Sequence, residues 1–195
     1  MNDTQCLCLS LECAKAGRHV GDCPCTEENQ IKNAAMLEFL IESNKIEDVD
    51  DPDSLIQALY AWDYLSEQKK LSRSVILKTH KILMLHQHLM PNERGYFRQC
   101  NVQVGGHIKL SWQSVPYAIT ELVQRIEFIA DVKYSDEDLE TMNQSLHVQF
   151  EDIHPFVDGN GRVGRMIMNW WRLSRGLPIL VIKASERLAY YKWFE

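Results

Sequence analysis

The segment from Ile153 to Arg165, IHPFVDGNGRVGR, concentrates groups that bind phosphate and groups that transfer protons. It holds one imidazole, one carboxylate, three glycines and two guanidinium groups, and an apolar helical run from Met166 to Leu173 follows it. A glycine-rich loop lets backbone N–H groups approach an anion, and the positive end of the following helix faces the same point. The segment therefore predicts a site for nucleotide phosphates.

Each charged or titratable side chain of this loop has a use in phosphate chemistry. Arg162 and Arg165 are planar donors that match phosphate oxygens. Asp158 suits Mg²⁺, which keeps several waters and binds through one carboxylate plus substrate phosphates. His154 remains for proton transfer, because an unperturbed imidazole titrates near neutrality. The loop thus predicts a phosphate-transfer site that carries its own base.

A dinucleotide-binding reading of the same loop is rejected. Gly159, Gly161 and Gly164 also satisfy the pattern G-x-G-x-x-G. That pattern needs a preceding buried strand, a βαβ unit and a later acidic residue. Residues 140–152 have helical spacing instead, and no alternation of strands and helices follows.

The pattern His-Pro-Phe-x-Asp-Gly-Asn-Gly-Arg-x-x-Arg, complete from His154 to Arg165, resembles the signature of the Fic (Fic/DOC) family. The resemblance continues in Leu146–Phe150 and Met166–Asn169 and covers residues 28 to 195. It implies a mainly α fold, a compact Fic-type helical bundle with one short β-hairpin flap. It also implies a protein adenylyltransferase that moves AMP from Mg·ATP to a Ser, Thr or Tyr hydroxyl of a target protein.

In this resemblance His154 is the base that deprotonates the target hydroxyl, and Asp158 holds the Mg²⁺. The loop backbone and Arg162 form an anion hole, the Asn160 amide also positions phosphate, and Arg165 seats the γ-phosphate. Phe156 anchors the loop to the core. The implied nucleotide-binding residues of the loop are Asp158, Gly159, Asn160, Gly161, Arg162, Val163, Gly164 and Arg165.

The segment from Ser43 to Asp48 resembles the inhibitory motif of the family, Ser/Thr-x-x-x-Glu-Gly/Asn. The resemblance implies that Glu47 pairs with Arg165 and takes the place of the γ-phosphate, since a carboxylate competes for the same guanidinium. The chain departs from the motif at Asp48. The alternative is an ordinary solvated acidic helix end, residues 47–51.

Residues 102–110 predict a β-hairpin, because apolar residues alternate around Gly105-Gly106. In the family this hairpin is the flap, which binds the target segment by strand pairing. Its implied nucleotide-bordering residues are Val102, Gln103, Val104 and Gly105. The alternative is a surface hairpin without a partner, which is only marginally stable alone.

Lys183–Tyr191 resembles the family helix whose paired tyrosines, here Tyr190 and Tyr191, flank the adenine. An aromatic face suits stacking of a base. The sequence ends at Glu195, before the family position that supplies an asparagine to the base. Base selectivity is therefore left open.

The first 26 residues differ in composition from the rest of the chain. They carry a set of thiols with one imidazole: Cys6, Cys8, Cys13, His19, Cys23 and Cys25. The alternatives are a structural Zn²⁺ site, although the spacing matches no known zinc motif, a disulfide staple, which needs an oxidising compartment, and a disordered tail with exposed cysteines. The expected organisation is a Cys-rich segment (1–26), an inhibitory helix region (27–51) and a catalytic core (52–195).

Helix signals occur along the core. Asp51-Pro52 starts one helix and Ser135 starts another. A helix after Ser72 is expected to run to Leu89 and to carry His80, His86 and His88. We interpret His80 as a packing residue, and metal binding by His86 and His88 is disfavoured because they face apart.

Composition excludes several classes of function. The 195 residues are 45% hydrophobic and 25% charged, with a net charge of −6. This balance argues against a nucleic-acid partner, no apolar run reaches the length of a membrane span, and a cytoplasmic location is expected. A deadenylylating enzyme, another NMP- or phosphate-transferring enzyme, and a non-catalytic antitoxin-like module remain alternatives, as does a homodimer.

Overall fold

Seven α-helices and one small hairpin make up the computed structural model within the residues that it describes, 27–130 and 132–194. The helices are α2 (Glu27–Ile46), α3 (Pro52–Ser66), α4 (Arg73–Leu83), α5 (Val115–Ala130), α6 (Asp136–Ile153), α7 (Asn160–Ser174) and α8 (Arg187–Tyr191). The strands are β1 (Gln103–Val104) and β2 (His107–Ile108), and short 3-10 turns occupy Trp112–Ser114, Ala184–Glu186 and Lys192–Phe194. The predicted mainly α fold with one hairpin is confirmed.

The helices begin where the sequence predicts caps. The Asp51 carboxylate accepts the Ser54 N–H at 2.8 Å, and Pro52 is the first residue of α3. Ser72 caps α4 through the Val75 N–H at 3.2 Å, and Ser135 caps α6 through the Asp138 N–H at 3.2 Å. Each side-chain oxygen satisfies a backbone donor that the first helical turn leaves unpaired.

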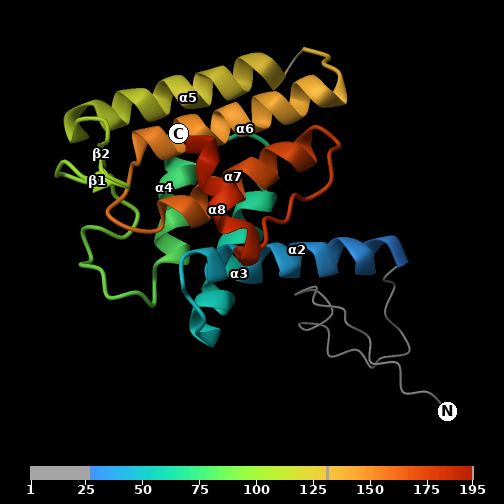
Figure 1. Cartoon of the computed structure of the whole chain (residues 1–195), viewed down its shortest axis with the longest axis horizontal. Helices are drawn as coiled ribbons and strands as arrows, with labels where there is room; N and C mark the ends of the chain where they lie inside the picture. Colours follow the sequence, from blue (N-terminus) through green and yellow to red (C-terminus); the bar gives the residue numbers. More distant parts are fainter. Residues whose placement is uncertain (1–26, 131, 195) are drawn as a thin grey trace.

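Helix α7 runs through the middle of the bundle (Figure 1) and is buried for most of its length. Helix α6 packs along it, α5 lies outside α6, and α2, α3 and α4 pack on its other sides. Burying each large apolar side chain contributes about 1.5–3 kcal/mol. The main core includes Phe39, Leu65, Ile76, Leu122, Phe150, Phe156, Val163 and Trp171.

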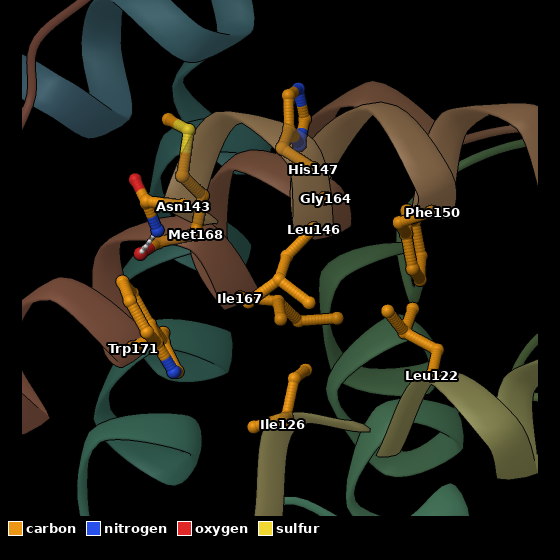
Figure 2. A pocket seen from close by; sticks show the side chains of 10 residues that line it. All are labelled: Leu122, Ile126, Asn143, Leu146, His147, Phe150, Gly164, Ile167, Met168 and Trp171. Atoms are coloured by element: carbon orange, nitrogen blue, oxygen red, sulfur yellow. Dashed lines mark hydrogen bonds between the residues drawn. The ribbon is translucent and has the colours of Figure 1, made fainter. Parts of the chain in front are cut away.

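Close packing of α5, α6 and α7 leaves a cavity of only about 10 Å³ between them. Figure 2 shows Leu146, Ile167 and Leu122 pointing into this region, whereas the His147 ring points away from it. Gly164 of α7 faces α6, where an added methyl carbon would lie 2.6 Å from Glu151 Oε1 and 2.9 Å from His147 Cε1. The missing side chain therefore lets the two helices approach closely.

Two expected helix bounds are corrected. Helix α4 ends at Leu83 rather than Leu89, because Met84 leaves helical geometry at φ −97°. His86 and His88 therefore lie beyond the helix, and His86 Nε2 is 2.6 Å from Ser54 Oγ. Helix α7 begins at Asn160, whereas the sequence predicts a helix from Arg162 to Arg175; Gly159 adopts φ 80° and ends the loop there.

The hairpin turns through Gly105 and Gly106, whose φ angles are 57° and 84°. Gln103 pairs with Ile108 and Val104 with His107. Left-handed φ at both turn positions favours glycine, which explains the predicted turn. The cysteine-rich segment and His19 lie outside the described residues. Within the described part, no helix is long and apolar enough to cross a membrane.

Candidate active site

The loop between α6 and α7 is held by its own side chains. Asn160 is 3% exposed; its Oδ1 accepts the Phe156 N–H at 2.8 Å and its Nδ2 donates to the Phe156 carbonyl at 3.0 Å. Both ends of the amide are therefore used to fold the loop. The expectation that this amide positions phosphate stays a prediction, and such a contact would use the second Nδ2 hydrogen.

His80 and Phe156 fix the loop to α4. Phe156 is fully buried and its ring stacks on His80 at a centroid distance of 3.7 Å. The Gly95 N–H donates to His80 Nδ1 at 2.9 Å, so Nε2 carries the hydrogen and donates to the Asp158 carbonyl at 3.0 Å. Burial lowers the pKa of His80 to about 4, which keeps this ring neutral. The packing role interpreted from the sequence fits these contacts.

His154 follows the last residue of α6 and adopts left-handed angles, φ 47° and ψ 64°. Its side chain is 16% exposed, and its Nδ1 lies 3.8 Å from Glu151 Oε2. Burial, assisted by the positive charge of Lys109, lowers the pKa of His154 to about 4. The imidazole is therefore neutral near pH 7, and neutral imidazole is the form that accepts a proton.

Arg162 lies in the first turn of α7 and is 2% exposed. Its Nη2 is 3.6 Å from Asp158 Oδ2, and its Nε and Nη1 have no hydrogen-bond partner among the described residues. Burial lowers the pKa of this guanidinium, since desolvation penalises the charge. A buried cation with free donors costs stability unless an anion binds it. Arg162 is thus a buried cation whose Nε and Nη1 are not satisfied within the described residues.

Asp158 fits the magnesium site that the sequence predicts. Its side chain is 54% exposed, and Oδ1 accepts the Gly159 N–H at 2.6 Å. A single accessible carboxylate beside an anion position matches Mg²⁺, which takes its remaining ligands from water and phosphate. The described residues contain no group of three or more His, Cys, Asp or Glu that could cage a metal by themselves.

The start of α7 is covered by the Glu47 carboxylate. A methyl group added to Gly161 would overlap Glu47 Oε1, so the carboxylate rests on the glycine itself. The N-terminal turn of a helix attracts negative charge. Gly161 is therefore required here for close approach of an anionic group rather than for its backbone angles.

Arg165 is 2% exposed, and four of its five N–H groups make hydrogen bonds. Nη2 bonds Glu47 Oε1 at 2.7 Å and the Ser43 carbonyl at 2.8 Å, Nε bonds Ser43 Oγ at 2.9 Å, and Nη1 bonds Tyr190 Oη at 3.1 Å. The structure thus brings together Ser43, Glu47 and Arg165, the pairing that the sequence resemblance implies. In this arrangement one Nη1 hydrogen is the part of the Arg165 guanidinium that these contacts leave unused.

Asp48 explains how the chain tolerates its departure from the Gly/Asn position of the motif. Its φ is 54°, in the left-handed region that glycine, asparagine and aspartate enter most easily. Its Oδ1 also accepts a hydrogen bond from Arg187 Nη1 at 2.9 Å. The substitution therefore preserves the turn that presents Glu47.

The two tyrosines of the C-terminal segment have different environments. Tyr190 is 3% exposed, its hydroxyl bonds His147 Nε2 at 2.7 Å, and its ring packs against Trp193 and Phe194. It cannot present a face to a base in this packing, so the predicted paired stacking is not formed here. Tyr191 is 39% exposed and has a free surface.

Three functional candidates were missed from the sequence: Arg98, Lys109 and Glu151. Lys109 follows β2 and bonds Asp152 of α6 at 3.2 Å, which ties the hairpin beside His154. Burial raises the pKa of Glu151 to about 7. The sequence offered one signal for them: Glu151, near the end of α6, precedes His154 by three residues. The exposed hairpin residues include Gln103, Val104, Gly105 and Ile108.

Several solved structures share the fold of this chain. A Fic-domain signaling protein from Bacteroides thetaiotaomicron superposes with a TM-score of 0.73 at 19% identity, covering 87% of this chain and 74% of that one. A Fic family protein from Desulfovibrio desulfuricans superposes with a TM-score of 0.67 at 19% identity, covering 93% and 62%. At this identity the likeness establishes the fold class alone.

The sequence comparisons establish the family. Residues 76–171 match the Fic/DOC family model, and the chain belongs to this family. The protein adenylyltransferases Fic of Drosophila willistoni and Drosophila melanogaster are each 31% identical over 153 residues, 75% of this chain. The chain spans less than a third of their length, 29% and 30% respectively.

Proposed function

We propose that this chain is a protein adenylyltransferase, which transfers AMP from Mg·ATP to a Ser, Thr or Tyr hydroxyl of a target protein. The observation that carries the proposal is the buried Arg162, whose Nε and Nη1 have no partner among the described residues, at the start of α7. His154 supplies a neutral base on the same loop. The activity named for the curated relatives agrees with this chemistry.

The transfer is a displacement at the α-phosphorus of ATP. His154 accepts the proton of the target hydroxyl, the oxygen forms a bond to the α-phosphorus, and the bond between the α-phosphorus and the bridging oxygen breaks to release pyrophosphate. Arg162 and the backbone N–H groups at the start of α7 stabilise the charge that develops on phosphate oxygens. Mg²⁺, held by Asp158, would neutralise phosphate charge when bound.

Glu47 is proposed to inhibit this reaction. Its carboxylate lies over Gly161 and bonds Arg165 at 2.7 Å, the place and the donor that a γ-phosphate would use. ATP must therefore either displace Glu47 or bind in an unproductive pose. The flap is proposed to dock the target by strand pairing, and Ile108 of β2 is 82% exposed there. The cytoplasmic location stays a prediction.

The test is intact mass after incubation with Mg²⁺ and ATP. The wild type, Glu47→Gly, and the double variant Glu47→Gly/His154→Ala are compared, each with and without ATP. We expect Glu47→Gly to gain the mass of one AMP group, the wild type to gain much less, and the double variant to gain none. Removing the carboxylate frees Arg165, whereas removing the imidazole deletes the base.

The outcomes separate the chemistry from the inhibition. An equal adduct on wild type and Glu47→Gly would contradict the inhibitory role and leave the transfer intact. An unchanged adduct in the double variant would remove His154 as the base. If Glu47→Gly binds ATP in calorimetry but modifies neither itself nor any protein of a lysate supplied with labelled ATP, the adenylyltransferase proposal is wrong.

A further inference from the structure

The Arg98 side chain makes four hydrogen bonds at the border between the flap and the catalytic loop. It is 2% exposed. Its Nε donates to the His154 carbonyl at 2.7 Å and its Nη1 to the Cys100 carbonyl at 2.7 Å. Its Nη2 donates to the Ile153 carbonyl at 3.3 Å and to the Leu110 carbonyl. One guanidinium thus serves four backbone acceptors.

These four carbonyls belong to the parts of the molecule that must meet during transfer. Cys100 precedes β1 and Leu110 follows β2, so they are the two legs of the flap. Ile153 ends α6, and His154 is the proposed base. The Arg98 backbone N–H also donates to the Pro155 carbonyl at 2.9 Å. A single residue therefore joins both legs of the flap to three consecutive residues of the catalytic segment.

Arginine suits this position for physical reasons. Its fork of donors is planar and rigid, so bonds to several carbonyls fix their relative positions, whereas an ammonium group on a flexible stem does not. The carbonyls at the end of α6 also carry the negative end of the helix dipole, which favours a cation there. His154 in turn holds a left-handed conformation at φ 47°, which a non-glycine residue keeps only when its surroundings impose it.

We propose that Arg98 is a positioning residue for the transfer reaction: it locks the flap and His154 in one register, so that a hydroxyl docked on the flap meets the imidazole. The proposal rests on the proposed adenylyltransferase function for its kinetic part. The mechanical part, coupling of the flap to residues 153–155, stands on the hydrogen bonds alone. None of these hydrogen bonds of Arg98 involves Arg162, where the phosphates are proposed to bind, or the Glu47–Arg165 pair.

The first experiment measures hydrogen exchange in full-length wild type, Arg98→Met, Arg98→Lys and the control Arg125→Met. Arg125 is an exposed arginine of α5 that bonds Gln149 at 3.0 Å. In Arg98→Met we expect backbone amides of residues 98–110 and 153–158 to exchange faster together, by about tenfold. Amides of α5 and α3 keep their rates. Faster exchange of the flap alone, or of neither segment, would overturn the coupling.

The second experiment measures transfer in the Glu47→Gly background, with Mg·ATP as the nucleotide and self-modification followed by intact mass. Arg98→Met is expected to lower the rate at saturating ATP by about a hundredfold, because small misplacements of reacting groups have effects of that size. The dissociation constant for Mg·ATP, from calorimetry, should change less than about twofold. Arg98→Lys should recover only part of the rate, and Arg125→Met should equal its parent.

Failure of this proposal and failure of the proposed function look different. If the Glu47→Gly parent forms no adduct, the proposed function fails while the exchange experiment still decides the coupling. If the parent is active and Arg98→Met keeps its rate, the positioning role is wrong. A loss of rate that is matched by an equal loss of ATP affinity and of thermal stability also contradicts it, since a merely structural residue would behave so.

Discussion

At the scale of one residue, Arg162 is a buried cation whose donors are not all used within the described residues. The guanidinium is buried with free Nε and Nη1, and its nearest carboxylate, Asp158, stands 3.6 Å away from Nη2. Desolvation of unpaired donors is unfavourable without ligand, and the same donors bind phosphate more strongly in a dry environment. Arg165, by contrast, directs four of its five N–H groups to Ser43, Glu47 and Tyr190.

The first prediction is that Arg162 increases the affinity for Mg·ATP but lowers the stability of the protein without ATP. Arg162→Met should weaken Mg·ATP binding by more than about tenfold, because a charged hydrogen bond contributes about 1.5–3 kcal/mol. Without ATP the melting temperature of the same variant should be about 2–4 °C higher than that of the wild type, because the substitution removes a buried unpaired charge. Calorimetry and thermal melts check both effects. A variant that is destabilised without ATP would show that Arg162 is satisfied within the protein.

At the scale of elements, the site depends on how α2 and α6 pack against α7. Helix α6 delivers His154, and the last turn of α2 delivers Ser43 and Glu47 to Arg165. The C-terminal segment lies across the end of α2 (Figure 1), where the Ala184 N–H donates to Glu42 Oε2 at 2.8 Å. The turn that carries Glu47 is therefore held from two sides, by α7 and by the segment that contains α8.

The second prediction concerns the α6–α7 contact. In Gly164→Ala the added carbon would lie 2.6 Å from Glu151 Oε1 and 3.0 Å from His147 Nδ1. Overpacking of this kind costs about 1–3 kcal/mol, which exceeds the gain in helix propensity of roughly 1 kcal/mol. The free energy of unfolding should therefore fall, as chemical denaturation can measure. Gln144→Ala, on the exposed side of α6, is the control and should stay within about 0.5 kcal/mol. A stabilised Gly164→Ala would contradict the contact.

At the scale of the whole molecule, buried histidines make stability depend on pH. Burial lowers the pKa of His80 to about 4, of His147 to about 3 and of His154 to about 4. Burial raises the pKa of Glu151 to about 7. Between pH 4.5 and 6.5 the unfolded chain binds more protons at the three histidines, whereas the folded chain binds more at Glu151. The histidines outnumber the carboxyl group, so stability rises with pH across this window.

The third prediction follows from that balance. The free energy of unfolding should increase from pH 5 to pH 6.5, by up to about 2 kcal/mol per pH unit. Glu151→Gln should make the increase steeper, because it removes a carboxyl group whose pKa burial raises to about 7 in the folded state. Urea denaturation at pH 5, 5.75 and 6.5 measures both slopes. A constant or falling stability in the wild type would mean that the three histidines are not buried as neutral rings.

Local chemistry made much of this protein predictable from its sequence. Asp51, Ser72 and Ser135 cap helices because a side-chain oxygen next to free N–H groups works in any context, and Gly105-Gly106 turns the hairpin because glycine tolerates positive φ. The order of residues from His154 to Arg165 indicated the phosphate loop for the same reason. The pairing of Glu47 with Arg165, 118 residues away, was anticipated only through resemblance to the family.

Sequence by itself determined the helices, the hairpin turn and the set of reactive groups, since these depend on neighbours along the chain. Tertiary structure decided which of these groups are left without hydrogen-bond partners inside the protein. It directed the Asn160 amide into its own loop, buried Tyr190 against His147 and Arg165, and gathered four carbonyls around Arg98. The physical reason is that hydrogen-bond satisfaction and desolvation depend on distance in space. Groups from segments far apart in the sequence meet only when the helices pack.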